Sequence, residues 1–285
     1  MKKVIVSDVV PRVAAIHDLS GIGRCSLTVV IPVLSVMGAQ VCPMPTAVLS
    51  SHSGGFGQFS FVDLTSEMGG MIDHWKQLNL GFDCIYSGFL GSSAQIEIVE
   101  NFIDSFSQSN GENRPLVVVD PVMGDQGKRY QTYTAEMQEK MRRLVAKADL
   151  ITPNMTEACF LLGEPYNPIV SDIEAGKTLL KRLADLGPSK VVITGAEMGD
   201  GSRCNLAYAR EDFYLVKYSH IPVHYPGTGD LFTSVLVGTL LKTGDLQSAV
   251  ATATDHVRLT VEVTHAHQTP EREGVLLERT LGNLI

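Results

Sequence analysis

The sequence predicts an α/β fold built on a mostly parallel β-sheet with helices on both faces. Short runs of apolar, β-branched residues alternate along the chain with longer segments of helical periodicity. These short runs lack the polar face that a half-exposed antiparallel strand would show. Strands buried on both faces and joined by helices are typical of parallel sheets, so a helix-sheet-helix arrangement is expected.

Six segments have the composition of buried strands, and the segments between them have helical patterns. The strands are expected at residues 13–17, 41–49, 84–87, 116–120, 150–152 and 190–194. The helices are expected at residues 25–37, 61–78, 92–107, 134–146 and 171–186. Segments 204–209 and 213–219 flank the charged turn Arg210-Glu211-Asp212 and predict a hairpin at the edge of the sheet.

Length and composition favour a single domain covering residues 1–285. No linker rich in Pro, Gly or Ser separates two halves, although the length would allow two domains. The 44% of hydrophobic residues are ample for a core, and the net charge of −8 argues against nucleic acid or an anionic membrane as a partner. Any affinity for phosphate must therefore be local.

The cysteines and the N-terminal residues point to the cytoplasm. Five scattered cysteines without a Cys-x-x-Cys pair suggest neither a zinc site nor a disulfide framework. Asp8, Pro11 and Arg12 interrupt the apolar start of the chain before it has the length of a signal peptide. The longest apolar run, residues 27–39, contains Pro32 and is shorter than the ~20 residues of a membrane helix.

The most informative stretch is the glycine-rich turn of residues 225–231, which leads into an apolar helix running to about Thr243. The backbone N–H groups of Gly227, Thr228 and Gly229 can converge on a phosphate at the positive end of the helix dipole. A carboxylate in the first turn of a helix usually serves as a cap, but beside a bound phosphate the charge of Asp230 would be repulsive. The residue is better explained as a general base that takes a proton from an attacking hydroxyl. The stretch therefore predicts phosphoryl transfer, with a tight turn and a helix cap as the structural alternative.

Two further polar motifs follow strands, at the sheet edge where ligands bind in such folds. In the run from Asp120 to Asp125, Asp-Pro-Val-Met-Gly-Asp, two carboxylates flank a Pro and a Gly, which suits the management of Mg²⁺ and triphosphate charge through water. Residues 126–133 are polar and basic and are expected to form a lid over ATP, with a solvated loop as the alternative. Asn154 followed three residues later by Glu157 is the pattern of a capping box at a helix start, so these two polar residues can be explained by a purely structural role.

These motifs resemble those of the ribokinase-like superfamily of small-molecule kinases, and most closely its pyridoxal/pyridoxamine kinase branch. The resemblance extends from Ala15 to Glu278 and implies a three-layer α/β/α sandwich. It implies transfer of a phosphoryl group from ATP to the hydroxymethyl group of pyridoxal, pyridoxamine or pyridoxine, which yields the 5′-phosphate. It also implies Mg²⁺, K⁺ as a further candidate cation, and a homodimer.

On this resemblance, the residues leaving the first strands would contact the vitamer. Thr46 would hydrogen-bond the edge of the pyridine ring, His52 would lie on a loop near the substrate, and Phe89 would pack over the ring. Asp18 and Ser20 would touch the substrate from the first loop. Pyridoxal kinases usually carry serine at the position of Asp18, whereas hydroxymethylpyrimidine kinases favour the Asp-x-Ser-Gly run found here. A helix cap is the structural alternative for Asp18.

The resemblance also implies contacts to the nucleotide and the metal. The residues that would contact ATP are Asp120, Tyr133, Thr152, Thr194 and Thr228. The residues that would hold Mg²⁺, through water, are Asp125, Asn154 and Glu157. The region from Tyr208 to His224 would form one wall of the adenine pocket.

Three alternatives to a pyridoxal kinase follow from the same residues. The runner-up is a hydroxymethylpyrimidine kinase of thiamine synthesis, which the first loop favours. A regulator that binds nucleotide or vitamer without turnover is disfavoured by Asp230, because a binding protein gains nothing from a carboxylate beside phosphate. Gly21-Ile22-Gly23 begins a dinucleotide fingerprint, but Ser26 stands at the third glycine position.

Overall fold

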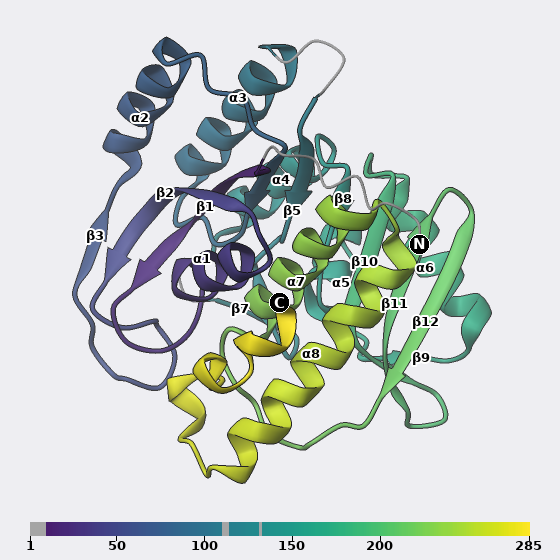
Figure 1. Ribbon diagram of the computed structural model, residues 1–285. Coiled ribbons are helices and arrows are strands. Elements are labelled where there is room, and N and C mark those ends of the chain that lie inside the picture. The colour runs from purple at the N-terminus through teal and green to yellow at the C-terminus, as the bar shows by residue number, and fades with distance from the viewer. Residues whose placement is uncertain (1–9, 110–113, 131–132) are drawn as a thin grey trace, which may run out of the picture.

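The computed structural model describes residues 10–109, 114–130 and 133–285, and its centre is one ten-stranded sheet (Figure 1). The strand order is β12-β11-β10-β8-β5-β4-β1-β2-β3, with β9 paired to β10. The strands are β1 (Arg12–Ser20), β2 (Gln40–Leu49), β3 (Phe61–Asp63), β4 (Cys84–Ser87), β5 (Leu116–Val119), β8 (Leu150–Ile151), β9 (Ile169–Val170), β10 (Lys190–Met198), β11 (Arg203–Ala209) and β12 (Asp212–Tyr218). A separate two-stranded ribbon consists of β6 (Gly124–Asp125) and β7 (Lys128–Arg129).

The sheet is mostly parallel, as the sequence predicts. Neighbouring strands from β10 through β8, β5, β4 and β1 to β2 run parallel, whereas β3 pairs antiparallel with β2 at one edge. At the other edge, β11 and β12 form the predicted hairpin, with Arg210 and Glu211 at positive φ in its two-residue turn. Paired positive φ values give the type of turn that matches the twist of a hairpin.

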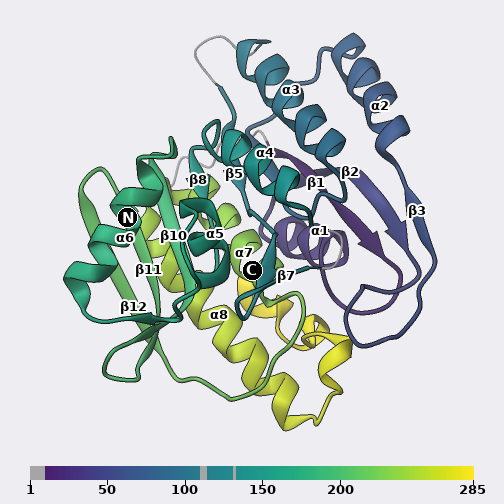
Figure 2. The ribbon, with the colours of Figure 1, turned by 180° about the vertical axis from the view of Figure 1, so that it is seen from behind.

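Helices cover both faces of the sheet, which confirms the three-layer α/β/α sandwich. One layer contains α1 (Leu27–Val36), α7 (Thr228–Thr243) and α8 (Leu246–Ala266). The other, in front in Figure 2, contains α2 (Thr65–Gln77), α3 (Ser93–Ser109), α4 (Ala135–Val145), α5 (Met155–Leu162) and α6 (Ile173–Ala184). Among the described residues, no helix is both long enough and apolar enough to span a membrane.

Strand β1 shows why the sequences of the buried strands are continuous apolar runs. Ala14 and Ile16 pack into the core beneath the α2–α6 layer, whereas Val13 and Ala15 pack beneath α1, α7 and α8. All four side chains are fully buried. Successive side chains of a strand point to opposite faces, so both faces of this strand must be apolar.

Besides the short strands β6, β7 and β9, which were not expected, three larger differences from the sequence prediction affect the site. The expected helix at 61–78 is wrong at its start, because Phe61 and Val62 pair with β2 and the helix begins only at Thr65, whose N–H bonds the Asp63 carboxylate at 2.7 Å. Helix α8 was not expected, and it is separated from α7 by Gly244 in the left-handed region (φ 69°) and capped by Asp245. Strand β1 continues to Ser20, so Asp18 lies in a strand and not in the following turn.

The order of the strands sets the place where a ligand can bind. The chain goes from β1 to β2 on one side and then returns to place β4 on the other side of β1. The connections after β1 and β4 therefore diverge and leave a crevice at the carboxyl end of the sheet. Residues leaving β1, β4, β5, β8 and β10 all reach this edge.

We expect Leu236→Ala in α7 to lower the free energy of unfolding by about 2–5 kcal/mol, because the fully buried leucine would leave a cavity beneath the sheet. Leu78→Ala is the matched control, since that leucine is 54% exposed at the end of α2 and its loss should cost less than about 0.5 kcal/mol. Chemical denaturation of both variants checks this. Equal losses would contradict the placement of α7 in the core.

Candidate active site

Two adjoining cavities lie at the carboxyl end of the sheet. The larger has a volume of about 720 Å³ and contacts the exits of β4, β5, β8 and β10 as well as the start of α7. The smaller, of about 210 Å³, lies between residues 218–225 and helix α8. Both cavities are lined by Thr194, Gly195, Tyr218, His220, Val223, His224, Tyr225, Thr228 and Gly229. The arrangement suits an elongated ligand that extends from one cavity into the other.

The turn before α7 forms the floor shared by both cavities. Gly227 is the N-cap with φ 82°, and a Cβ there would lie 2.0 Å from the carbonyl oxygen of Arg24, so only glycine fits. Within the described chain, no side chain caps this helix. The N–H groups of its first turn are therefore available to an anion at the positive end of the helix dipole, as the sequence predicts.

Asp230 stands in this first turn and reaches back toward β1. Its Oδ2 accepts the backbone N–H of Ser26 at 2.7 Å, and its side chain is only 15% exposed. Burial raises the pKa of Asp230 to about 7, helped by the nearby charge of Asp18 and opposed by the Ser26 hydrogen bond. A carboxylate whose pKa lies near neutral pH can both accept and release a proton, which is what a general base requires.

Ser26 is a part of the site that sequence reasoning missed. Its φ of 49° and ψ of −133° are unusual for a residue other than glycine, and such a conformation costs about 1–3 kcal/mol. The strain aims its N–H at Asp230 and brings Ser26 to the wall of the larger cavity. No motif signals this role, because it depends on the backbone and not on the side chain.

His17 is the second missed residue, and it lies behind Asp230. Its Nδ1 is 3.8 Å from Asp230 Oδ1, and its ring meets the Tyr86 ring edge-on with centroids 4.4 Å apart. Burial lowers the pKa of His17 to about 3, so the imidazole is neutral. A Cβ on Gly88 would lie 2.3 Å from Nδ1, so Gly88 leaves the space that this ring occupies.

Two buried carboxyl groups form the opposite wall of the larger cavity. Glu157 accepts the N–H of Met123 at 3.1 Å and that of Asn154 at 2.9 Å, and Asn154 accepts the Glu157 N–H at 3.0 Å, which completes the predicted capping box. Burial raises the pKa of Glu157 to about 8. Burial, then the charges of Glu157 and Asp230, raise the pKa of Asp120 well above its usual range.

The oxygens of this wall fit a hard divalent cation. Asp120, Asp125, Asn154 and Glu157 all line the larger cavity, and Asn154 is oriented by donating to the Gly124 carbonyl oxygen at 2.9 Å. Among the described residues, no cluster of three or more His, Cys, Asp or Glu side chains is arranged to hold a metal ion directly. Mg²⁺ retains waters and binds substrate phosphates readily, so these residues suit a water-mediated site.

The expected vitamer residues lie at the β1, β2 and β4 exits, but only one lines a cavity. Phe89 reaches the larger cavity, and its carbonyl oxygen accepts the hydroxyl of Thr46 at 3.2 Å. Asp18 is buried and accepts the hydroxyl of Ser20 at 3.0 Å. Helix α1 has no side-chain cap, so the alternative that Asp18 caps this helix is wrong. Burial raises the pKa of Asp18.

His52 is buried in the loop after β2, and both of its ring nitrogens are engaged. Nδ1 accepts the N–H of Gly54 at 3.0 Å, and Nε2 lies 2.6 Å from the carbonyl oxygen of Arg272. Because Nδ1 accepts, Nε2 carries the proton and donates it to that carbonyl. The Phe56 ring packs edge-on against His52, with centroids 5.1 Å apart.

The nucleotide residues fall into two groups. Asp120, Thr152, Thr194 and Thr228 line the larger cavity, whereas Tyr133 does not. Its hydroxyl donates to the Met137 carbonyl oxygen at 3.2 Å inside the first turn of α4. Tyr130 lines the cavity instead. Of the predicted lid, residues 131–132 lie outside the described residues.

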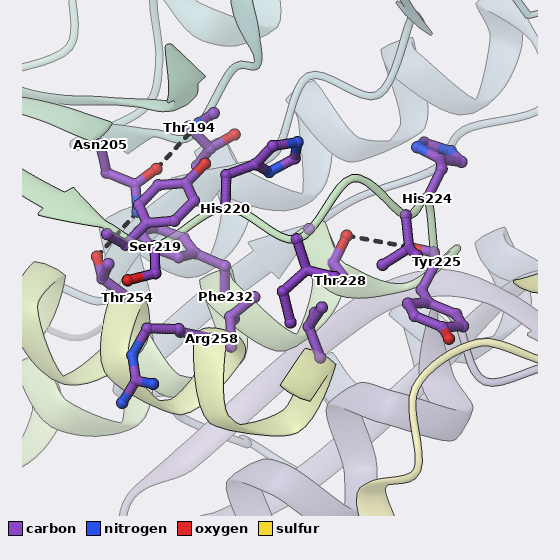
Figure 3. Close-up of a pocket in the computed structure, with 17 residues that line it drawn as sticks. Thr194, Asn205, Ser219, His220, His224, Tyr225, Thr228, Phe232, Thr254 and Arg258 are labelled. Carbon is purple, nitrogen blue, oxygen red and sulfur yellow. Dashed lines mark hydrogen bonds between the residues drawn. The ribbon is translucent and has the colours of Figure 1, made fainter. Parts of the chain in front are cut away.

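Of the wall expected from Tyr208 to His224, only the part from Tyr218 to His224 lines the smaller cavity, and a second wall lies on the unexpected helix α8 (Figure 3). Phe232 of α7 and Arg258 of α8 lie on one side, and Thr194 lies on the other. Asn205 joins the walls, since it accepts the Gly195 N–H at 2.9 Å and donates to Thr254 at 2.8 Å. The register shift of β10 at residues 193–196 opens the strand at this point.

Comparison with known proteins identifies the family. A model of the phosphomethylpyrimidine kinase family matches residues 76–274, which is more than half of the chain. The chain belongs to this family. It is therefore a kinase, and the resemblance to the pyridoxal kinase branch of the ribokinase-like superfamily is confirmed by the relatives.

Three relatives illustrate the similarity of this kinase to known proteins. Pyridoxal kinase PdxY of Granulibacter bethesdensis is 29% identical over 232 residues, 79% of each chain. A crystal structure from Bacteroides thetaiotaomicron, described as a phosphomethylpyrimidine kinase and obtained with pyridoxal, is 47% identical with a TM-score of 0.91 and covers 97% of this chain and 96% of its own. Pyridoxal kinase from Lactobacillus plantarum is 30% identical, with a TM-score of 0.87 and 97% of both chains covered.

The raised pKa of Asp230 predicts the pH dependence of this kinase. As a general base, Asp230 would have to be ionised to accept a proton, so kcat/KM for the acceptor alcohol should be constant above pH 7 and fall about tenfold for each pH unit below it. A steady-state pH profile at saturating ATP checks this. A profile that stays flat down to pH 5 would mean that Asp230 has an ordinary pKa or takes no proton.

Proposed function

We propose that this kinase transfers the γ-phosphoryl group of ATP to the hydroxymethyl group of a B6 vitamer: pyridoxal, pyridoxamine or pyridoxine. The observation that carries the proposal is the position of Asp230, a buried carboxylate beside the free helix N-terminus of residues 227–229. Relatives named pyridoxal kinase and the Bacteroides thetaiotaomicron structure with pyridoxal support the vitamer as the acceptor.

In the proposed mechanism, Asp230 accepts the proton of the substrate hydroxymethyl group as the hydroxymethyl oxygen attacks the γ-phosphorus of ATP. The bond from this phosphorus to the bridging oxygen breaks, and ADP leaves with that oxygen. The Ser26 N–H keeps one carboxylate oxygen fixed, which leaves the other to face the substrate hydroxyl. The amides of Gly227, Thr228 and Gly229 hold the charge of the transferring phosphoryl group at the helix N-terminus. Positioning and charge stabilisation supply most of the rate enhancement, and no covalent enzyme intermediate is required.

The carboxyl groups of the opposite wall are proposed to hold Mg²⁺. Asp125 is the most accessible of them, and Asn154 and Glu157 would act through bound water. Mg²⁺ bound there would supply positive charge that neutralises the phosphate oxygens. Asp120 and Glu157 are disfavoured as charged groups when no cation is near, because burial and then nearby carboxylates raise both pKa values. Glu157 and Asp230 act on Asp120, and Asp125 acts on Glu157.

Hydroxymethylpyrimidine is retained as a second candidate acceptor, and one observation favours it. Asp18 and Ser20 form the Asp-x-Ser-Gly run of hydroxymethylpyrimidine kinases, and Asp18 lies close enough to Asp230 to raise its pKa. A buried carboxyl group there would attract a ring amino group or a protonated ring nitrogen. Both classes of acceptor carry the hydroxymethyl group that the mechanism needs.

We further propose a cytoplasmic homodimer, with K⁺ as a candidate activating cation. The edge strand β3 supports the dimer, since Phe61 and Val62 are exposed there beside Val48 of β2. An exposed apolar strand edge invites pairing with another copy. The described cysteines are free thiols, which fits a reducing compartment.

A coupled assay of ADP release tests the proposal. The protein is mixed with ATP and Mg²⁺ and with pyridoxal, pyridoxamine, pyridoxine or hydroxymethylpyrimidine in turn, and the phosphorylated product is identified by mass. The proposal expects the highest kcat/KM with a B6 vitamer. Preference for hydroxymethylpyrimidine would select the second candidate, and binding of all four without ADP release would reject the kinase mechanism.

We expect Asp230→Asn to lower kcat by about 10²–10⁴ while the KM for ATP stays nearly unchanged, because the amide can still accept the Ser26 N–H but cannot take the proton. Initial rates of vitamer phosphorylation at pH 8 give the measurement. Thermal unfolding of the variant is the control for folding. Near-normal turnover would remove Asp230 from the mechanism.

Glu157→Gln should raise the Mg²⁺ concentration needed for half-maximal rate, because the neutral amide attracts the hydrated ion less strongly. Both Glu157 oxygens accept backbone N–H groups, so glutamine also loses one of these bonds and should cost about 1–3 kcal/mol of stability. Rates measured across a Mg²⁺ titration separate the two effects. Lower stability with an unchanged Mg²⁺ requirement would show that Glu157 is purely structural.

A further inference from the structure

The segment that follows α8 crosses three loops of the active site. Residues 269–279, here called the tail strap, lie beside the loops that follow β1 and β2, as Figure 1 shows for the yellow C-terminal part of the chain. They also contact the turn before α7. These contacts join parts of the chain that are more than 200 residues apart in sequence.

The loop after β1 is held by a set of bonds to Arg24. The carbonyl oxygen of Glu273 accepts both the backbone N–H and the Nη1 of Arg24, each at 3.1 Å. The Arg24 Nε donates to the Glu278 carboxylate at 3.0 Å. A bond from the peptide group and two from the guanidinium fix this arginine in one geometry, which a solvated surface arginine would not adopt.

The loop after β2 is held through His52. Its Nε2 donates to the Arg272 carbonyl oxygen at 2.6 Å, and its backbone N–H donates to the Ile22 carbonyl oxygen at 3.2 Å, which ties the two loops together. The Arg272 guanidinium carbon lies 5.4 Å from the centre of the Phe56 ring, within cation–π range. Arg272 of the strap therefore contacts this loop at both His52 and Phe56.

The strap also reaches the turn before α7, residues 225–229, here called the catalytic turn. The Tyr225 hydroxyl donates to the Thr269 carbonyl oxygen at 3.4 Å, and Glu271 lines the larger cavity. Arg24, which the strap holds, packs its carbonyl oxygen against Gly227 so closely that a Cβ would lie 2.0 Å away. The position of Arg24 thus transmits the position of the strap to the residues that bind phosphate.

We infer that the tail strap positions the acceptor-binding loops and the catalytic turn, and that His52 and Arg24 are positioning residues, not contacts to the acceptor. The inference rests on the proposed kinase reaction with a hydroxymethyl acceptor. His52 has no ring nitrogen left for a substrate, since Gly54 and Arg272 occupy both. Within the described chain, no strap residue lines the smaller cavity, so displacing the strap is expected to change acceptor binding more than nucleotide binding.

Gly274 offers a way to lift the strap without removing a side chain. A Cβ there would lie 2.7 Å from the Arg24 carbonyl oxygen, and its φ is +73°. Gly274→Ala should therefore push the strap away from Arg24. Two controls separate this contact from general effects: Gly282→Ala lies in the same tail with nothing within 4 Å, and Gly244→Ala has a φ of +69° with nothing within 4 Å.

We expect Gly274→Ala to raise the KM for the vitamer and lower kcat/KM about tenfold or more, while the KM for ATP changes less than about twofold. Both control variants should keep wild-type values for the vitamer. A vitamer KM in Gly274→Ala equal to that of Gly244→Ala would overturn the inference. So would an equal rise in the KM for ATP, because the strap would then be a general stabilising element.

Amide hydrogen exchange makes the test independent of the substrate. Exchange in residues 20–26 and 50–57 should be faster in Gly274→Ala than in wild type, with no such change in Gly282→Ala. If the wild-type protein phosphorylates no vitamer but the variants show this exchange pattern, the proposed function is rejected and the inference about the strap stands. If the wild-type protein phosphorylates a vitamer but exchange in Gly274→Ala is unchanged, the inference about the strap is rejected and the proposed function stands.

A double-mutant cycle covers the case in which Gly274→Ala does not fold. Glu278 is 64% exposed at its side chain, so Glu278→Gln and Arg24→Gln can be combined without emptying the core. We expect the double variant to lose less vitamer kcat/KM than the product of the two single losses. Strictly multiplicative losses would contradict the idea that the two residues act through one contact.

Discussion

The hydrogen bond from the Ser26 N–H to Asp230 is the interaction on which the site depends. It joins the exit of the first strand to the first turn of α7, two segments more than 200 residues apart in sequence. It fixes one oxygen of the carboxylate and favours its charged form, against the burial that raises its pKa. The strained φ of Ser26 and the glycine at position 227 both serve this approach, since each lets two backbone segments meet closely.

A second constraint is the concentration of acidic groups around a site for an anionic nucleotide. Asp18, Asp120, Glu157 and Asp230 all have raised pKa values, chiefly because they are buried. The groups available to the anion at the start of α7 are instead backbone N–H groups, which carry no net charge and repel no cation. In the proposed function, this division would let a protein of net charge −8 bind phosphate at one turn and a divalent cation at the facing wall.

The sequence predicted those parts of the fold and site that depend on local patterns. Buried strands, the edge hairpin, the glycine turn and the capping box at Asn154 all have short-range signals, and the structure confirms them. The misplaced start of α2 and the missed α8 have a tertiary cause. Phe61 and Val62 become a strand only because β2 lies beside them, and α8 mixes apolar with polar residues because it covers hairpin strands and a cavity.

The missed site residues are those whose role arises only from folding. His17 and Ser26 carry no recognisable motif, since their importance comes from lying 3.8 Å and 2.7 Å from a carboxylate on a distant helix. Conversely, His52 and Tyr133 looked like ligand contacts by position in a motif. In the structure, their side-chain polar atoms are instead hydrogen-bonded to backbone groups.

The central claim, that burial and one backbone bond set Asp230 as a base near neutral pH, can be measured directly. Carbon-13 NMR of the labelled Asp230 carboxyl carbon, assigned with Asp230→Asn, reports its titration in the protein without ligands. The account predicts a midpoint near the value of about 7 that burial gives this residue. A midpoint near that of a solvated aspartate, about 4, would contradict it.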